Sequence, residues 1–276
     1  MIELPEAITI ARQMTEALKG KRIESAMRGN APHKFAFYNR PPEDYAALLK
    51  GKTIGESVAH GSGIFAYAEP DYALFLGTGG ERILFHQSEK TLPKKHQLLL
   101  HFEDGTYLTV TVQGWGSAML FHRSEIAKHP YAGAQGVSPL SEAFTFEYFE
   151  GRFGEMRPDD PRNVKEFMIS KPGIWGVANG CLQDILFLAR IHPRRKIVTL
   201  STAERRALYE ATHEMLRQAT EQGGRDTEYD LYNHLGQYKK ILDARSAGQP
   251  CPRCGTAIEK ISFMGGSAYF CPQCQV

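Results

Sequence analysis

The sequence predicts a multi-domain α+β protein with an N-terminal β-sandwich and flanking helix, a helical domain, and a C-terminal zinc-binding β-hairpin. Three observations support this prediction. Short runs of alternating apolar and polar residues fill positions 21–121, helical patterns follow after position 140, and two Cys-x-x-Cys pairs lie in the last 26 residues. The corresponding predicted domains are residues 1–131, 141–242 and 248–276.

The N-terminal region is expected to begin with an amphipathic helix and to continue as strands. Ile8, Ala11, Thr15 and Leu18 recur at the spacing of one helical face. Alternating runs separated by glycine, proline or aspartate are typical of the strands of a sandwich or barrel. These runs are residues 64–68, 72–76, 82–86, 97–102 and 107–112.

The next region carries helical signals. Residues 132–140 contain two glycines and a proline and are expected to form a linker. Helices are predicted from Asp160 through Met168, over residues 182–189, and over residues 227–235. Between the last two, Ser201 and Glu204 have the spacing of a capping box, which opens a long helix to Glu221 that two glycines terminate.

The four C-terminal cysteines predict a zinc site. Cys251 and Cys254 form one pair, Cys271 and Cys274 form the other, and 16 residues separate the pairs. Four thiolates with this spacing complete a tetrahedral shell around one ion and leave no position for a substrate water. The intervening residues alternate around a glycine turn that begins near Met264, which predicts a β-hairpin. We therefore expect one structural Zn²⁺ that stabilises the fold and performs no chemistry.

Two disulfides, or reduced thiols without a metal, are the alternatives for these cysteines. Residues 1–20 contain five charged residues and no apolar stretch long enough for a signal peptide. The chain also has no apolar run of about 18 residues, the length that spans a membrane. A cytoplasmic compartment is therefore expected, and disulfides are rare there. The fifth cysteine, Cys181, lies in an apolar helical stretch and is expected to be buried rather than nucleophilic.

Charge alone says little about partners. The formal net charge is +2, which is too small to indicate a polyanionic partner. Several basic clusters, such as residues 19–22 and 194–196, are compatible with a phosphate backbone. A solvated surface has the same composition.

Four features, read in order, resemble the formamidopyrimidine-DNA glycosylase and endonuclease VIII family. They are the terminus Glu3-Leu4-Pro5-Glu6, the segment 176–180 (Gly-Val-Ala-Asn-Gly), the tripeptide 191–193 (Ile-His-Pro), and the four-cysteine hairpin. The resemblance covers essentially the whole chain. It implies a DNA-repair protein of base excision, with DNA glycosylase and lyase activity on double-stranded DNA. It also implies that the helical domain contains a helix–two-turn–helix element that grips DNA phosphates.

The resemblance implies a DNA contact at Asn179, to which basic residues of the same region are added as expected contacts. The family asparagine that matches Asn179 donates to a phosphate beside the lesion, and an amide at a helix start is also a suitable anion site on physical grounds. A simple helix cap is the alternative role for Asn179. The expected nucleic-acid-binding residues are Asn179, Lys165, Lys171, Arg194, Arg253 and Lys260.

The catalytic position departs from the family pattern. In active members, the initiator methionine is removed and the proline that follows attacks the sugar C1′. This chain has Ile2 there, so Met1 is expected to keep a primary amine one residue out of register. An α-amino group has a pKa near 8 and supplies some neutral nucleophile. The distance from the amine to C1′ is the difficulty, because a shift of one residue moves the amine by up to about 3.5 Å. A misplacement of about 1 Å can already reduce a rate roughly a hundredfold.

Two carboxylates of the family pattern remain. Glu3 matches the residue that assists ring opening and proton transfer, and Glu6 matches the one that supports the catalytic terminus. The alternative is structural, because carboxylates at the start of a helix are stabilised by its dipole. Met1, Glu3 and Glu6 are therefore the expected catalytic residues if the protein is an enzyme.

Other family positions are lost as well. The family's loop lysine falls at or near Gly61, its wedge methionine at Thr78, and its hairpin arginine at Gly266 or Ser267. In the loop at residues 112–116, only Trp115 offers an intercalating ring. Residues 223–242 match the family's variable base-recognition loop, and their helical texture predicts a closed pocket.

These departures predict a zinc-containing DNA-binding protein that recognises damaged or abasic duplex DNA, with weak or absent standard glycosylase activity. The alternative is an active base-excision glycosylase/AP lyase that uses the Met1 amine or a water activated by Glu3. A third interpretation is recognition of RNA or a protein through the zinc hairpin. The expected location is cytoplasmic, nucleoid-associated if bacterial, without a membrane partner.

Overall fold

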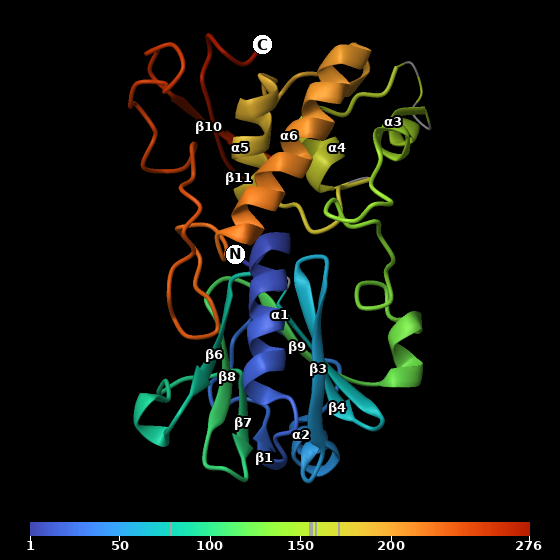
Figure 1. The fold of residues 1–276 in the computed structure, drawn as a ribbon, viewed down its shortest axis with the longest axis vertical. Coiled ribbons are helices and arrows are strands. Elements are labelled where there is room, and N and C mark those ends of the chain that lie inside the picture. The colour runs from blue at the N-terminus through green and yellow to red at the C-terminus, as the bar shows by residue number, and fades with distance from the viewer. Residues whose placement is uncertain (78, 155–156, 158, 171) are drawn as a thin grey trace. The chain divides into compact units, whose positions relative to one another are not determined.

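The chain divides into two compact units (Figure 1). The computed structural model describes residues 1–77, 79–154, 157, 159–170 and 172–276. The first unit contains Met1–Gln135 and Gln222–Gln237, and the second contains Gly136–Glu221 and Tyr238–Val276. The predicted domain ranges stay predictions, and the observed division assigns residues 222–237 to the unit that contains the amino terminus. In the ranges that the structure describes, every helix lacks the combination of length and apolar character needed to cross a bilayer.

The first unit is the predicted β-sandwich with its flanking helix. Its helices are α1 (Leu4–Leu18) and α2 (Pro42–Leu49), with short 3₁₀ helices η1 (Glu89–Thr91) and η2 (Arg123–Lys128). Its strands are β1 (Ile23–Met27), β2 (Ala36–Phe37), β3 (Thr53–His60), β4 (Gly63–Glu69), β5 (Tyr72–Gly77), β6 (Glu81–His86), β7 (Leu98–Phe102), β8 (Tyr107–Val112) and β9 (Gly116–His122). The five predicted strands correspond to β4 through β8.

Two sheets make up the sandwich. One has the strand order β1-β7-β8-β6 and the other has the order β2-β9-β5-β4-β3. The short edge strand β2 runs parallel to β9, whereas the other pairs of both sheets are antiparallel. The chain of antiparallel hairpins follows from glycine-containing turns between alternating apolar runs.

Helix α1 packs into the core of this unit and lies beside β3 (Figure 1). The predicted face is only partly correct, because Ile8 and Thr15 are half-buried. The hydroxyl of Thr15 exchanges hydrogen bonds with the backbone of Ser57 on β3, at 3.1 and 2.9 Å. The most deeply buried apolar residues of the helix are Ala7, Ile10, Met14 and Leu18.

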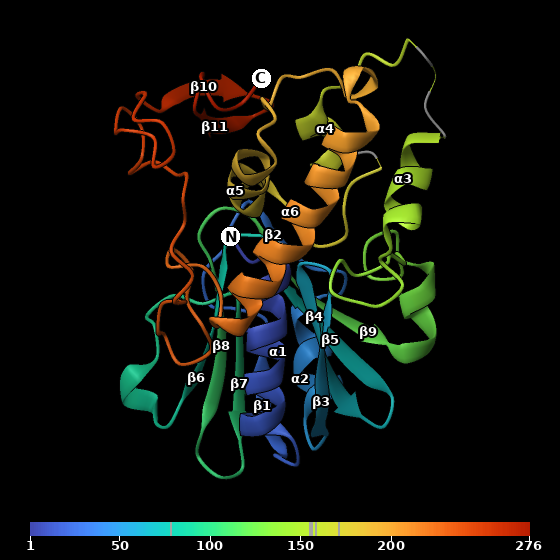
Figure 2. The same cartoon turned by 45° about the horizontal axis from the view of Figure 1, so that its top comes forward.

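The second unit contains the predicted helical region and the hairpin. Its elements are α3 (Phe146–Gly154), α4 (Val164–Ile169), α5 (Asn179–Ala189), η3 (Ile197–Thr199), α6 (Thr202–Glu221), β10 (Glu259–Phe263) and β11 (Gly266–Phe270). Helix α5 packs against α6 and against β11 (Figure 2). The capping box of α6 is confirmed: the Ser201 amide donates to the Glu204 carboxylate at 2.8 Å, and the Glu204 amide donates to Ser201 Oγ at 3.3 Å.

The predicted β-hairpin is also present. Strands β10 and β11 pair in antiparallel register from Glu259 opposite Phe270 to Phe263 opposite Gly266. The two residues of the turn, Met264 and Gly265, both have positive φ, at 53° and 72°. Such a two-residue turn matches the twist of the flanking strands.

Two predicted helices differ from the structure. Helix α4 begins at Val164 rather than at Asp160, because the Asn163 side chain caps it by accepting from the Glu166 amide at 2.9 Å. The helix predicted over residues 227–235 is wrong, since this segment consists of turns and one isolated bridge. The Asp230 carboxylate accepts from two nearby backbone amides, and such local bonds compete with a helix.

Candidate functional site

The amino terminus is fixed in the first unit by its second residue. Ile2 is buried, with 3% of its surface exposed, and its amide donates to the carbonyl of Gly79 at 2.8 Å. The next residue, Glu3, precedes α1, and its amide donates to the carboxylate of Glu6 at 3.0 Å. Glu3 and Glu6 therefore both turn inward at the start of α1.

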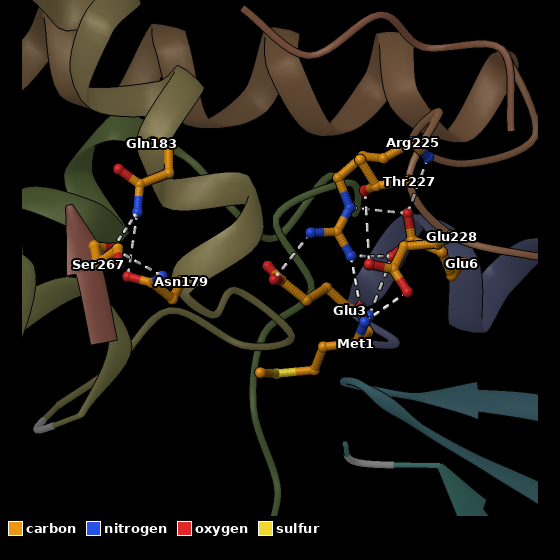
Figure 3. Close-up of polar contacts among 9 residues, drawn as sticks. All are labelled: Met1, Glu3, Glu6, Asn179, Gln183, Arg225, Thr227, Glu228 and Ser267. Atoms are coloured by element: carbon orange, nitrogen blue, oxygen red, sulfur yellow. Dashed lines mark hydrogen bonds and ion pairs between the residues drawn. The ribbon is translucent and has the colours of Figure 1, made fainter. Parts of the chain in front are cut away.

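Arg225 lies between these two carboxylates (Figure 3). Its Nη1 donates to Glu3 Oε1 at 3.0 Å. Its Nε and Nη2 donate to the two oxygens of Glu6 at 2.9 and 2.7 Å, a bidentate pairing. Nη2 also donates to the carbonyl of Met1 at 2.6 Å. We call Glu3, Glu6, Arg225 and the Met1 carbonyl the terminal clamp.

The terminal clamp is almost completely shielded from solvent. The side chains of Arg225 and Glu3 are 1% and 0% exposed. The backbone assists the pairing, because the Arg225 amide donates to Glu6 Oε1 at 2.9 Å. Gly224 precedes it with a φ of 107°, a conformation that L side chains rarely adopt. The chain path into the clamp therefore depends on glycine at that position.

The amino group of Met1 has its own partner. It forms an ion pair with the carboxylate of Glu228, three residues after Arg225 in the sequence (Figure 3). The Met1 residue itself is 38% exposed. An ammonium group has no free electron pair, so attack from Met1 requires the loss of a proton first.

A buried carboxyl group, that of Glu81, binds Gly79, whose carbonyl accepts the hydrogen bond from the Ile2 amide. Glu81 on β6 accepts from the amide of Gly79 at 2.8 Å and from the amide of Ser117 at 2.6 Å. Burial raises the pKa of Glu81 to about 8, and these amide donors oppose that rise. Any side chain at Gly116 would collide with this carboxyl group, because a Cβ atom there would lie 2.1 Å from Glu81 Cδ.

The four predicted zinc ligands come together in the second unit. Their sulfur atoms all lie within 4.8 Å of one another. Cys254 Sγ is 3.5 Å from Cys271 Sγ, and Cys251 Sγ is 3.9 Å from Cys274 Sγ. A tetrahedral ion with Zn–S bonds of about 2.3 Å requires sulfur separations of about 3.8 Å. These separations are too long for disulfides, so the disulfide alternative is wrong.

The centre is also supported by its surroundings. Cys251 and Cys271 are buried in a small core with Phe187 and Tyr269. The amide of Arg253 donates to Cys251 Sγ at 3.4 Å, which stabilises a thiolate ligand. Cys181 is fully buried on α5, as expected, and is not part of this cluster.

Asn179 joins α5 to the hairpin (Figure 3). It is the first residue of α5, and the N-cap is Ala178, so capping is not the observed use of its amide. Its Nδ2 donates to the carbonyl of Ser267 at 3.1 Å, and its Oδ1 accepts from Gln183 Nε2 at 3.2 Å. Gln183 also donates to Ser267 and accepts from the Tyr269 amide, both at 3.0 Å. Ser267, one of the two positions expected to match the family arginine, is therefore bound to α5 through its backbone.

Two other predicted DNA-binding residues make internal contacts. Lys165 is 1% exposed, and its Nζ donates to the carbonyl of Phe263 at 2.9 Å near the hairpin tip. Burial lowers the pKa of Lys165. Arg253 donates to the carbonyls of Phe187 and Leu188 at 2.7 and 3.4 Å, where α5 ends. Both side chains thus hold the hairpin and the zinc site against the helices.

The remaining predicted DNA-binding residues lie at the surface or outside the described residues. Arg194 is exposed, and its guanidinium carbon is 5.1 Å from the ring centroid of Phe263. Lys260 on β10 is exposed, with Nζ 5.9 Å from the ring centroid of Tyr269. Lys171 and Thr78, the latter at the family's wedge position, lie outside the described residues.

Sequence reasoning missed several residues of this site. Arg225, Glu228, Glu81 and Gln183 are absent from the predicted set. The only signal for Arg225 was its place directly after the two glycines that end α6. Glu81 occupies an ordinary alternating position of a strand, which gave no indication of its burial.

Models of known protein families match three parts of the chain. The formamidopyrimidine-DNA glycosylase N-terminal domain matches residues 1–113, the formamidopyrimidine-DNA glycosylase H2TH domain matches residues 135–230, and the zinc finger found in FPG and IleRS matches residues 248–276. The predicted fold class is therefore confirmed. The four cysteines are the ligand set of one structural Zn²⁺, as predicted.

Whole-chain relatives agree with these matches. Formamidopyrimidine-DNA glycosylases of Cytobacillus firmus and Halalkalibacterium halodurans are each 30% identical over 284 residues, with 100% of both chains covered. A crystal structure of Lactococcus lactis Fpg with DNA that contains an abasic site matches with a TM-score of 0.85, at 23% identity and 99% coverage of each chain.

The sandwich, the helix–two-turn–helix region and the zinc finger together define the architecture of a DNA glycosylase. The chain belongs to the formamidopyrimidine-DNA glycosylase family.

Proposed function

We propose that this protein binds double-stranded DNA at damaged or abasic sites and has weak or absent standard glycosylase and lyase activity. The family supports DNA as the partner, and the similar Lactococcus lactis structures are complexes with abasic or Fapy-dG DNA. The terminal clamp is the observation that carries the second part of the proposal.

In the terminal clamp, Glu3 and Glu6, the two carboxylates expected from the family pattern, are both bound to Arg225. General acid–base catalysis requires a group within hydrogen-bond reach of the substrate proton. Glu3 and Glu6 face a buried guanidinium instead, and Glu6 accepts from it with both oxygens. Proton transfer to a sugar oxygen therefore requires Arg225 to leave a buried, charge-assisted pairing, which is unfavourable.

The expected nucleophile, the amine of Met1, is also poorly positioned for attack. Ile2 occupies the position where active members have proline, and its buried side chain and bonded amide hold it in place. The Met1 amine is held by Glu228. A Schiff-base mechanism needs an amine aligned on C1′, and the Met1 amine must first leave its ion pair with Glu228.

The grip on DNA is proposed to come from the second unit. Arg194 beside the hairpin and Lys260 on β10 present exposed cations. Asn179 and Lys165 bind the hairpin backbone, and Arg253 binds the carbonyls at the end of α5. Lys171 completes the proposed set. Charge-assisted phosphate contacts of this kind weaken as salt rises.

Binding and trapping measured on the same duplexes test the proposal. Duplexes with an abasic site or an open-ring lesion are expected to bind at low salt. Borohydride is expected to give little or no covalent adduct with them. Intact-mass measurement of the protein shows whether Met1 is retained. Absence of binding at low salt would contradict the proposal, and an efficient adduct would contradict its second part.

The alternative is an active glycosylase/AP lyase. One observation favours it: the residue that carries the amine, Met1, is 38% exposed, so a substrate carbon can reach it if Glu228 is displaced. A water activated by Glu3 is the other route. Mass spectrometry that locates a borohydride-stabilised adduct on Met1 would establish the first route. A cytoplasmic, nucleoid-associated location accompanies either function and stays a prediction.

A further inference from the structure

Three large aromatic side chains are exposed at one edge of the five-stranded sheet. Phe35, Phe37 and Trp115 are 48%, 45% and 44% exposed, and we call them the aromatic strip. Phe37 belongs to the edge strand β2, which pairs in parallel register with the start of β9. The amide of Gly116 donates to the carbonyl of Phe35 at 2.9 Å, so Trp115 lies across from Phe35.

The backbone beneath the aromatic strip is closely fixed. The Gly80 amide donates to the Trp115 carbonyl at 2.8 Å, and the Gln113 amide donates to the Gly80 carbonyl at 2.7 Å. A Cβ atom at Gly79 would lie 2.2 Å from the Trp115 carbonyl oxygen, so only glycine permits this approach. Exposed rings on a fixed backbone lose little conformational entropy when they bind a partner.

The surroundings of the strip are basic. Residues 31–37 include His33 and Lys34 and contain no Asp or Glu. Lys34 Nζ is 5.3 Å from the ring centroid of Phe35. Residues 112–117, on the other side of the strip, carry no charge.

We propose that the aromatic strip binds single-stranded DNA by stacking on its unpaired bases, with Lys34 near its phosphates. Aromatic side chains beside cations are the pattern by which proteins bind unpaired strands. Phe35 lies in the turn directly before β2 and Phe37 is the second residue of that strand, so the two exposed rings flank Ala36 along the chain. The inference rests on the proposed DNA-binding function.

Fluorescence gives a direct test of stacking. The chain has two tryptophans, so a W175F variant leaves Trp115 as its sole indole. A short oligothymidylate is expected to quench the Trp115 emission of W175F. A base-free oligomer with the same number of phosphates is expected to leave the emission unchanged and to bind about tenfold or more weakly.

Substitution of the strip provides the second arm. F35A/F37A is expected to reduce affinity for oligothymidylate by about 10- to 100-fold. F35L/F37L, which keeps apolar volume without rings, is expected to show a similar loss. Y131A is the matched control, because Tyr131 is 73% exposed in the same unit but lies outside the strip. Circular dichroism and zinc content confirm that the variants are folded.

The outcomes separate this inference from the proposed function. Equal binding of the two oligomers, unchanged quenching, or wild-type affinity in either Phe variant would overturn the aromatic strip as a base-binding surface. If abasic duplex still binds in that case, the proposed function stands. If the wild-type protein binds neither duplex nor oligothymidylate, both proposals are lost.

Discussion

Arg225 is the residue on which the arrangement of the amino terminus depends. Its guanidinium neutralises one of two buried carboxylates and ties the Met1 carbonyl to both. A buried ion pair gives little net stability over an apolar replacement of the whole cluster. Removal of one partner is different, because it leaves buried charge without compensation.

We therefore expect Arg225→Met to destabilise the protein by about 3–5 kcal/mol in urea unfolding. The substitution keeps much of the side-chain volume, so the loss reports the uncompensated charges of Glu3 and Glu6. Arg217→Met is the matched control, since Arg217 pairs with Glu214 and Glu221 at the surface of α6. That control should change stability far less, because exposed ion pairs are screened by solvent. Equal effects of the two substitutions would contradict the structural role of the clamp.

Glu81 predicts a pH dependence of stability. Its folded pKa of about 8 lies above the ordinary value of 4.5, because burial disfavours the charge. Between these two values the folded protein holds a proton that the unfolded chain has lost, so the free energy of unfolding falls as pH rises through this window. The slope from this group is at most about 1.4 kcal/mol per pH unit.

Urea unfolding of the wild type and of Glu81→Gln at about pH 5.5 and about pH 7.5 measures this contribution. The wild type is expected to lose more stability between the two conditions, because the amide introduced by the substitution does not titrate while all other groups are shared. Identical pH slopes for the two proteins would show that Glu81 does not titrate in this range.

At the scale of elements, the hairpin β10–β11 depends on the zinc site and on α5. A two-stranded hairpin is marginally stable by itself in water. Here its open end holds four thiolates, and Asn179 and Gln183 bind its backbone near the tip. The metal and the polar bonds therefore act at opposite ends of the same hairpin.

Zinc removal is expected to unfold this element. The protein should contain one zinc ion per chain, and a strong chelator should lower its thermal midpoint, with a loss of stability on the order of several kcal/mol. Cys271→Ser should reduce the zinc content. Cys181→Ser is the control, since Cys181 is buried on α5 away from the ligand set. A full zinc content in C271S would contradict the four-thiolate assignment.

Local patterns were sufficient for some elements and insufficient for others. The capping box of α6 and the glycine turn of the hairpin depend on neighbouring residues, and both were predicted correctly. The helix expected over residues 227–235 was wrong because Asp230 binds backbone amides that a helix would use. The adjacent Arg225 has its partners Glu3 and Glu6 at distances of 222 and 219 residues along the chain. No local pattern encodes such a pairing.

For the whole molecule, the ionic-strength dependence of DNA binding is the main prediction. Arg194→Ala and Lys260→Ala should each weaken binding to abasic duplex and reduce the slope of log affinity against log salt by about 1. Arg12→Ala is the control, because Arg12 pairs with Glu16 on the exposed side of α1. Unchanged slopes for both Arg194→Ala and Lys260→Ala would remove these residues from the proposed interface.

The family, the three-part architecture and the zinc ligands could all be predicted from the sequence, because they depend on motif order and on spacing along the chain. The terminal clamp and the internal roles of Lys165 and Asn179 could not. These roles depend on which side chains the fold brings together, and residue type alone does not determine that.

The first unit is built from two separate stretches of the chain, and this has a consequence during translation. Glu6 leaves the ribosome 219 residues before Arg225 does. At a translation rate of about 5–20 residues per second, roughly 10–40 s pass between the synthesis of Glu6 and the synthesis of Arg225, its buried cationic partner. During that interval Glu3 and Glu6, at the start of α1, lack the guanidinium of Arg225. The first unit can therefore be completed only after the long helix α6 has been synthesised.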